Sequence, residues 1–347
     1  MQTERLAELI AQFATRRIAV VGDFFLDKYL DIEPALAEPS VETGLTAHQV
    51  VRVRHTPGAA GTVVGNLAAL GASTLHAVGF TGEDGEAWDL RRDLNAIGCS
   101  TTGLCATPDR MTPTYCKPRD MHAEGLQGEH ERLDTKNHTP THPELIQRVV
   151  EQLDVLLPQV DAVIVLDQVM ETDCGVVTAQ LRDIIANRAQ GNPDVIFWAD
   201  SRAKIREFCN VIIKANEFEV VGMVNPLPGA IVEDAELFPA MTDLRAVNHA
   251  PVFVSRGAAG MMVSDPEPAL IRAVRVEGKI DFTGAGDSVT AGAVLALTAG
   301  ATLAEAALVG NLVASVTIQQ LNTTGTASPE QLTEQLKIWQ QQESEQI

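Results

Sequence analysis

Basic residues are scarce in this chain relative to acidic ones. Its 347 residues include 26 Lys and Arg against 46 Asp and Glu, which gives a formal net charge of −20 at pH 7. Nucleic acids and anionic membranes are bound through basic surfaces, so this balance excludes both as partners. An anionic ligand would have to be held locally, by helix N-termini, by a divalent metal or by single basic residues such as Lys214, Arg256 or Lys279.

Cysteine pairs and long apolar runs are also lacking. The cysteines are Cys99, Cys105, Cys116, Cys174 and Cys209. They are odd in number and contain no Cys-x-x-Cys pair, so neither a zinc site nor a disulfide framework is indicated. No stretch reaches transmembrane length, and residues 1–15 have the pattern of a charged amphipathic helix rather than of a signal peptide. We therefore expect a cytoplasmic protein.

Short β-branched runs alternate with helical patterns along most of the chain. Strands are expected at residues 17–22, 74–80, 162–166, 195–199, 211–214 and 252–255. Helices are expected at residues 62–70, 86–97, 143–157, 176–189 and 217–223. The uniformly apolar strand patterns are typical of parallel strands buried on both faces. The chain is thus predicted to be an α/β protein with a doubly wound, mostly parallel sheet flanked by helices.

Two segments, about residues 30–56 and 108–135, interrupt this alternation. The first ends in the alternating stretch Val50-Val51-Arg52-Val53-Arg54. Each segment is either a surface loop or a pair of strands. In the second case the two would form a small β sheet that projects from the main body as a lid and excludes water from a reacting group.

The run Asp281-Phe282-Thr283-Gly284-Ala285-Gly286-Asp287 stands before a small-residue, apolar segment that predicts a buried helix. Backbone amides at a helix N-terminus lack partners and the helix dipole favours negative charge, so the Gly-Ala-Gly turn suits a phosphate. Asp287 would lie beside that anion, where a carboxylate can take a proton from an attacking hydroxyl. The run predicts phosphoryl transfer, although a lone Gly-x-Gly is also found in ordinary turns and helix ends.

This run resembles the C-terminal motif Asp-x-Thr-Gly-Ala-Gly-Asp of the ribokinase-like (PfkB) sugar kinases. The resemblance implies an ATP- and magnesium-dependent kinase in which the amides of Gly284, Ala285 and Gly286 form an anion hole and Asp287 is the catalytic base. It extends over about residues 20–326, with three motifs in the family's order. It implies a single ribokinase-like domain of residues 1–347, whose lid is built from the two interrupting segments.

At the sugar end, residues 57–71 are similar to the family's N-terminal motif, in which small residues such as Gly58 let the sugar approach the backbone. Ala59 replaces the motif's second glycine, and Thr62 stands where the family has a sugar-binding Asn, so a single hydroxyl replaces separate donor and acceptor groups. Asp27 aligns with the acidic residue that holds sugar hydroxyls, and a carboxylate suits a vicinal diol. A glycine-rich helix packed closely on the sheet and a turn capped by Asp27 are the structural alternatives.

At the nucleotide end, Asn216 and Glu219 match the family's Asn-x-x-Glu motif, in which Glu organises magnesium, usually through water. Magnesium keeps much of its hydration shell and needs only one or two carboxylates. The same two residues fit a helix capping box, and the two interpretations are compatible. The resemblance adds four nucleotide contacts: Ser255, Arg256, Gly257 and Asn311.

Residues 167–168 and 200–202, together with Thr114, Lys117, Arg119 and the run 132–134, resemble the heptose-phosphate kinase branch of the family. That branch phosphorylates D-glycero-D-manno-heptose 7-phosphate at the anomeric position, so a small-molecule sugar or sugar phosphate is the expected substrate. Basic residues of the set either meet a substrate phosphate or lie on a solvated strand face. Members of the branch often carry a fused nucleotidyltransferase with a His-x-Gly-His motif, which this sequence lacks, so a second transferase activity is not expected.

Two alternatives stay open at this point. One is another sugar or nucleoside kinase of the same fold, and one is a non-catalytic ligand-binding regulator on the kinase scaffold. A Rossmann dehydrogenase is disfavoured, because Gly-x-Gly-x-x-Gly does not follow the first predicted strand. A homodimer paired through the lids rests on the resemblance alone. The sequence leaves open the accepting hydroxyl and activation by a monovalent cation.

Overall fold

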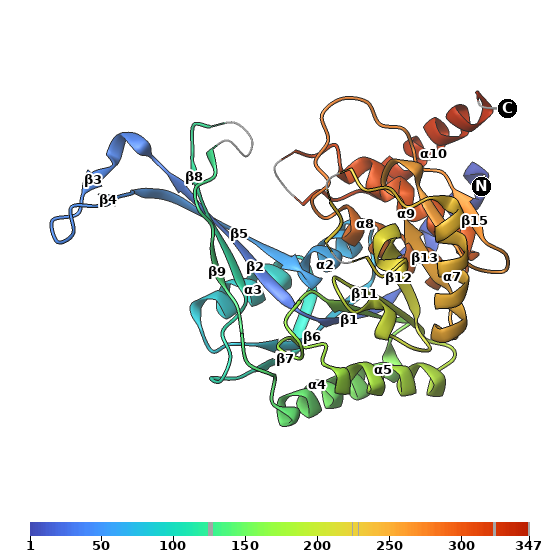
Figure 1. The fold of residues 1–347 in the computed structure, drawn as a ribbon, viewed down its shortest axis with the longest axis horizontal. Coiled ribbons are helices and arrows are strands. Elements are labelled where there is room, and N and C mark those ends of the chain that lie inside the picture. The colour runs from blue at the N-terminus through green and yellow to red at the C-terminus, as the bar shows by residue number, and fades with distance from the viewer. Residues whose placement is uncertain (124–127, 224, 228, 322–323, 346–347) are drawn as a thin grey trace.

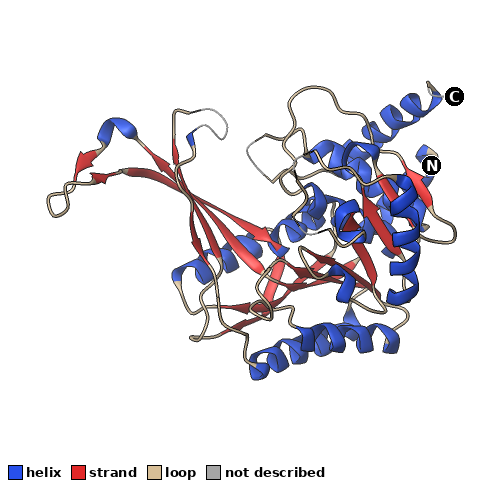
Figure 2. Ribbon diagram, viewed as in Figure 1, coloured by secondary structure: helices blue, strands red, loops and turns tan. Residues whose placement is uncertain are grey.

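The computed structural model describes the chain apart from residues 124–127, 224, 228, 322–323 and 346–347. Within that part, a nine-stranded sheet forms the centre of the molecule (Figures 1 and 2). Its parallel strands, in spatial order, are β7 (Cys99–Ala106), β6 (Thr74–Thr81), β1 (Arg17–Gly22), β10 (Ala162–Asp167), β11 (Ile196–Ser201), β12 (Ile212–Asn216) and β13 (Val252–Ser255). The short strands β14 (Met261–Val263) and β15 (Ala269–Ile271) continue it as antiparallel partners at one edge.

Helices cover both faces of this sheet, as the doubly wound prediction requires. One face packs against α1 (Thr3–Phe13), α2 (Ala60–Ala69), α3 (Gly85–Ala96), α8 (Ala285–Thr298), α9 (Leu303–Thr317) and α10 (Pro329–Ser344). The other packs against α4 (Pro143–Leu156), α5 (Ala179–Gly191), the short α6 (Glu217–Val220) and α7 (Asp234–Asn248). The central strands are buried along their length because apolar side chains meet a helix layer on each side. The predicted fold class is confirmed. Among the described residues, no helix is both long and apolar enough to cross a bilayer.

A second, four-stranded sheet projects from the main body (Figure 1). We call it the small sheet: β5 (Val50–Ala59), β2 (Phe24–Ile32), β8 (Thr114–Asp120) and β9 (Leu133–Thr135), in that spatial order. The hairpin of β3 (Glu38–Pro39) and β4 (Thr46–Ala47) lies at its far end. Both interrupting segments therefore contain strands rather than surface loops alone.

The sequence patterns missed β2, which starts only two residues after the central strand β1 ends. The turn between them is allowed by Gly22, since a Cβ there would lie 2.2 Å from the backbone oxygen of Leu166. β2 pairs with β5 along its length, and with β8 on its other side. Asp27 thus lies on a strand of the small sheet and not on a turn, so the sheet begins upstream of residue 30.

The strand order reverses at β1, which has β6 on one side and β10 on the other. In open α/β sheets, ligands bind outside the carboxyl ends of the strands at such a switch point. Asp23, Asp167, Ser201 and Asn216 all lie at or just beyond those ends. The fold therefore directs several of the polar residues singled out in the sequence toward one edge of the sheet.

Candidate active site

The run that precedes α8 forms a tight turn into the helix. Gly284 has φ 76° and ψ 5°, a left-handed conformation that favours glycine. The amide of Ala285 donates to the carbonyl of Phe282 at 3.1 Å, within the turn. In the described structure, the amides of Gly286 and Asp287 have no acceptor, as expected in the first turn of a helix. The N-terminal end of α8 therefore offers free N–H groups and the positive end of the helix dipole to an anion.

Lys214 brings a positive charge to the same place from β12. Its ammonium is 2.5 Å from Asp200 on β11, and a Cβ added at Gly286 would lie 3.3 Å from the Lys214 Nζ. Burial acts to lower the pKa of Lys214, but the carboxylates of Asp200, Glu219 and Asp287 together hold it above its usual value. The lysine thus stays charged beside the free amides. Because Gly286 has no side chain, the Lys214 ammonium can lie close to the start of α8.

Asp287 lies in the first turn of α8 and is partly exposed. Burial of its carboxyl, reinforced by the negative charge of Asp200, raises its pKa from 3.8 to about 7, against the opposing effect of Lys214 and Arg202. A carboxylate of this kind exchanges a proton near neutral pH. That is the property that general-base catalysis needs.

Asn216 and Glu219 form the capping box at the start of α6. The Asn216 side chain accepts the amide of Glu219 at 2.9 Å, and Oε2 of Glu219 accepts the amide of Asn216 at 2.7 Å. Burial raises the pKa of the Glu219 carboxyl. Its other oxygen, Oε1, has no hydrogen-bond partner in the described part of the chain.

An apolar cavity of 460 Å³ opens on the other side of the α8 turn, between that helix, α9 and the antiparallel edge of the central sheet. Ser255, Gly257, Gly286 and Asn311 line it. The Asn311 side chain donates to the carbonyls of Ile271, the last residue of β15, and of Arg272, at 2.9 and 3.2 Å, and so fixes one wall. Arg256 is not brought there. Its guanidinium pairs instead with Glu217 and Asp234.

The Asp27 side chain on β2 lies against Gly58 on β5, diagonally across the strand pair. Its Oδ1 is 2.7 Å from Nζ of Lys117 on β8, and a Cβ at Gly58 would lie 2.6 Å from its Oδ2. Lys117 also donates to the Tyr29 hydroxyl at 3.4 Å. Burial acts to lower the pKa of Lys117, while Asp27 and Tyr29 raise it, with a net rise. The lysine therefore fixes and partly neutralises the Asp27 carboxylate, a contact that strand pairing creates and that the sequence did not reveal.

The start of α2 joins the two ends of the site. Ala59, at its N-cap, has φ 53° and ψ −118°, a conformation that glycine adopts without strain and alanine does not. The glycine that the family motif has at this position thus has a conformational reason. Thr62 is buried, and its methyl group is 3.3 Å from where a Cβ would stand on Gly284. The N-terminal and C-terminal motifs therefore meet at Thr62 and Gly284.

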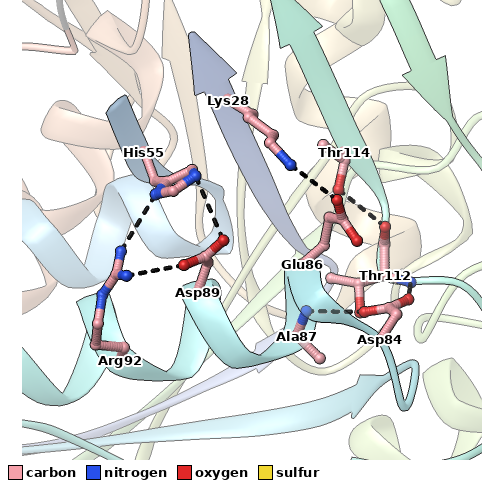
Figure 3. A network of polar contacts seen from close by, with 9 residues as sticks. All are labelled: Lys28, His55, Asp84, Glu86, Ala87, Asp89, Arg92, Thr112 and Thr114. Carbon is pink, nitrogen blue, oxygen red and sulfur yellow. Dashed lines mark hydrogen bonds and ion pairs between the residues drawn. The ribbon is translucent and has the colours of Figure 1, made fainter. Parts of the chain in front are cut away.

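Helix α3 holds the base of the small sheet through charged contacts (Figure 3). Lys28 of β2 pairs with Glu86 at 3.0 Å, and His55 of β5 lies 3.3 Å from Asp89. Arg92 contacts both Asp89, at 2.8 Å, and His55, at 3.2 Å. Because successive side chains of a strand point to opposite faces, these contacts leave the Asp27 face of the sheet directed away from α3.

Residues 17–331 match the model of the pfkB family carbohydrate kinases. The chain belongs to the pfkB family. It is accordingly an enzyme, an ATP-dependent sugar kinase, and the family predicted from its motifs is confirmed. A Rossmann dehydrogenase is excluded.

Curated pfkB relatives include the bifunctional protein HldE of Gluconobacter oxydans, 30% identical over 334 residues that cover 94% of this chain and 66% of that protein. The bifunctional protein HldE of Caulobacter vibrioides is 30% identical over 329 residues, 92% of this chain and 63% of that protein. The chain thus spans just under two thirds of the length of these relatives.

Solved pfkB-like structures show the same fold at low identity. Ribokinase of Arabidopsis thaliana, complexed with ribose and ATP, has a TM-score of 0.64 at 15% identity and covers 93% of this chain and 99% of its own. Phosphofructokinase-2 of Escherichia coli, in complex with substrates and products, has a TM-score of 0.68 at 18% identity, with 93% and 99% covered. The ribokinase-like fold is confirmed.

The magnesium expected for a pfkB kinase can be tested against the chemistry of the donors. The described residues contain no group of three or more His, Cys, Asp or Glu side chains that could hold a metal ion. Glu219 nevertheless has a free carboxylate oxygen in the crowded charge cluster beside Lys214 and Asp287. A single carboxylate, with water and phosphate oxygens as the other ligands, is a typical magnesium environment. The residues therefore fit a hydrated, phosphate-bound magnesium ion and not an all-protein cage.

Proposed function

We propose that this chain transfers the γ-phosphoryl group of ATP to a hydroxyl group of a sugar phosphate, with Asp287 as the general base. The observation that carries the proposal is the surroundings of Asp287. Its carboxyl has a pKa of about 7 and lies at the end of α8, beside two free amides and the charged Lys214. A base and an anion-binding turn in one place are what in-line phosphoryl transfer needs.

The proposed step uses these groups together. The sugar hydroxyl oxygen attacks the γ-phosphorus while its proton passes to the Asp287 carboxylate, and the bond from phosphorus to the β–γ bridging oxygen breaks, so that ADP leaves. The amide of Gly286 and the ammonium of Lys214 meet the charge on the transferred group, and Gly284 and Ala285 shape the turn. A positioned base contributes about 10²- to 10⁴-fold in rate, and one anion-hole donor about 3 kcal/mol.

The nucleotide would lie with its adenosine in the apolar cavity and its phosphates toward α8. Ser255, Gly257 and Asn311 line that cavity and are the proposed contacts, whereas Arg256 would act by bracing Glu217 and Asp234. Glu219 would hold magnesium through water, and the ion would supply positive charge that neutralises the β- and γ-phosphates.

The sugar would bind between Asp27 and the start of α2. Asp27 can accept two hydroxyl protons, Gly58 leaves room for its carboxylate, and Ala59 and Thr62 complete this end. The resemblance to the heptose-phosphate kinase branch makes heptose 7-phosphate the leading substrate. Basic groups on and beside the small sheet are consistent with a phosphorylated sugar: Lys117 and Arg119 on β8, and Arg132 just before β9. Lys117 and Arg132 also pair with Asp27 and Asp134. Thr62, which replaces the family's Asn, favours as second candidate another sugar kinase of the same fold.

A substrate panel tests this proposal. ADP release would be measured with ATP, magnesium and matched pairs of sugars and sugar phosphates, heptose 7-phosphate among them. We expect one sugar phosphate to exceed its unphosphorylated partner at least a hundredfold in kcat/KM. Equal turnover of both members of every pair would contradict the phosphorylated substrate class. If no sugar or sugar phosphate stimulates ADP release, the proposal that the chain phosphorylates a sugar is contradicted.

A further inference from the structure

A polar cavity of 290 Å³ lies outside the kinase site. It lies where the small sheet joins the main body. One wall comes from the segment between β7 and β8, with Thr107 and Arg110, and another from the segment between β9 and α4, with Thr139 and His142. Arg148 on the first half of α4 completes it. The two connecting segments are bonded to each other here, since the Arg110 guanidinium donates to the backbone oxygen of Thr139 at 2.7 Å.

Arg110 carries a buried charge that makes no ion pair with the described residues. It is only 8% exposed, and the carboxylate of the neighbouring Asp109 acts on it only from a distance, without a direct contact. Its NH1 donates to the Thr139 carbonyl and hydroxyl, while its Nε and NH2 have no acceptor among the described residues. Burial lowers the pKa of this arginine, against the weaker opposing effects of Cys174 and Asp109. Because a buried guanidinium without a direct ion pair is unfavourable, the cavity favours an anion.

The groups around Arg110 also favour an anion in the cavity. Arg148 reaches the cavity from α4 with one bond to the carbonyl of Ala106. The 14-residue helix α4 begins here with no side-chain cap, and the amide of Glu144 has no acceptor in the described structure, so the positive end of the helix dipole faces the cavity. The two acids of the lining, Asp109 and Glu144, are exposed at the rim, and the Glu144 side chain is 90% exposed.

We propose that this cavity binds the phosphate group of inorganic phosphate or of a small phosphomonoester. Arg110 and Arg148 would hold the phosphate oxygens, and the hydroxyl of Thr139 and the amide of Glu144 would complete the site. The volume is at the lower end for small-molecule pockets, which limits the organic part to a few atoms. In a chain with a net charge of −20, such a local concentration of positive charge is needed for any anion site. The ligand would bridge the segment that leads from β7 into β8 and the segment that leads from β9 into α4.

Hydrogen–deuterium exchange tests the site while the kinase site is blocked. The chain would be saturated with magnesium and a non-hydrolysable ATP analogue, and then titrated with inorganic phosphate and, separately, with methyl phosphate. We expect added protection of residues 107–111 and 137–145 with either probe, and the tighter of the two identifies the source of the phosphate. Protection confined to residues 281–289, or none at all with either probe, would overturn the proposal.

Two variants and a matched control sharpen the result. Arg148→Ala removes an exposed side chain and should fold normally, and we expect it to weaken phosphate binding at least fivefold by calorimetry under the same blocked conditions. Arg110→Gln should abolish binding. Lys337→Ala, which removes one charge from an exposed position on α10, should bind phosphate as the wild type does. If Arg148→Ala binds phosphate as tightly as Lys337→Ala, the site is not where we place it, whether or not Arg110→Gln folds.

Discussion

Replacing Asp287 by Asn should stabilise the folded chain at neutral and alkaline pH. The pKa of Asp287 is raised from 3.8 to about 7, chiefly by burial, so the folded state disfavours the ionised carboxylate. Between those two values the folded state keeps a proton that the unfolded chain has released. The wild type therefore loses stability as the pH rises from about 4 to about 7, and the loss is complete above the folded-state value.

The size of this effect follows from the pKa values. The gap between 3.8 and about 7 corresponds to about 4 kcal/mol of free energy of unfolding. Asp287 keeps some contact with solvent, which screens its charge, so we expect about 2 kcal/mol. At pH 5.5 roughly half of this penalty is present, since that pH lies midway between the two values. An asparagine carries no charge and avoids the penalty at every pH.

Urea unfolding at pH 5.5 and at pH 8 measures the difference. The variant Asp287→Asn should exceed the wild type in free energy of unfolding at pH 8, and its advantage should grow by about 1 kcal/mol from pH 5.5 to pH 8. Asp183→Asn, an exposed position on α5, serves as the control for the loss of one carboxylate. An advantage that is the same at both pH values, or that shrinks toward pH 8, would refute the reasoning.

Three further changes probe the site from other sides. Asp200→Asn removes a negative charge that raises the pKa of Asp287, so the midpoint of the pH profile of kcat/KM should fall by about one pH unit, and an unmoved midpoint would count against Asp287 as the base. Gly58→Ala would crowd the Asp27 carboxylate, so the KM for the sugar should rise about tenfold with the KM for ATP unchanged, whereas Gly65→Ala, with open space around it, should alter neither KM. Ala59→Gly relieves a strained backbone worth about 1–3 kcal/mol at a cost of about 0.5–1 kcal/mol in chain entropy, so urea unfolding should show a gain of about 1 kcal/mol, and a loss would contradict the strain.

The sequence addresses the α8 end of the site most directly because the physics there is local. Two glycines and a small-residue helix within one run predict free amides and a helix dipole, but the Ala285 amide, expected in the anion hole, donates to the Phe282 carbonyl instead. The role of Asp287 as the base stays a prediction. The central strands are predicted for a similar reason, since continuous apolar runs mark strands that are buried on both faces. The capping box of Asn216 and Glu219 is equally local, and the structure contains it.

What the sequence could not predict depends on contacts between distant segments. The strand β2 carries charges at Asp27, Lys28 and Asp31, and it forms because β5 and β8 pair with it on both sides. Lys117 reaches Asp27 only through that pairing. Arg256 looked available for a nucleotide, but two acids from separate segments occupy its guanidinium.

The positive φ of Ala59 is a further feature that residue identity alone conceals. Alanine ordinarily avoids this conformation, so the residue type alone does not predict it. Only the glycine that the family has at this position indicates it. The contact of Thr62 with Gly284, which brings the two motifs together, likewise required the packing of α2 against α8.

The most direct test of the central claim compares phosphoryl transfer by the wild type and by Asp287→Asn with the best sugar phosphate of the panel. ADP release and ATP affinity would be measured on the same preparations. The proposed mechanism predicts that kcat falls at least a hundredfold while the Kd for ATP, with magnesium, changes less than threefold. Near-normal turnover by the variant would contradict Asp287 as the base and, with it, the proposed chemistry at the end of α8.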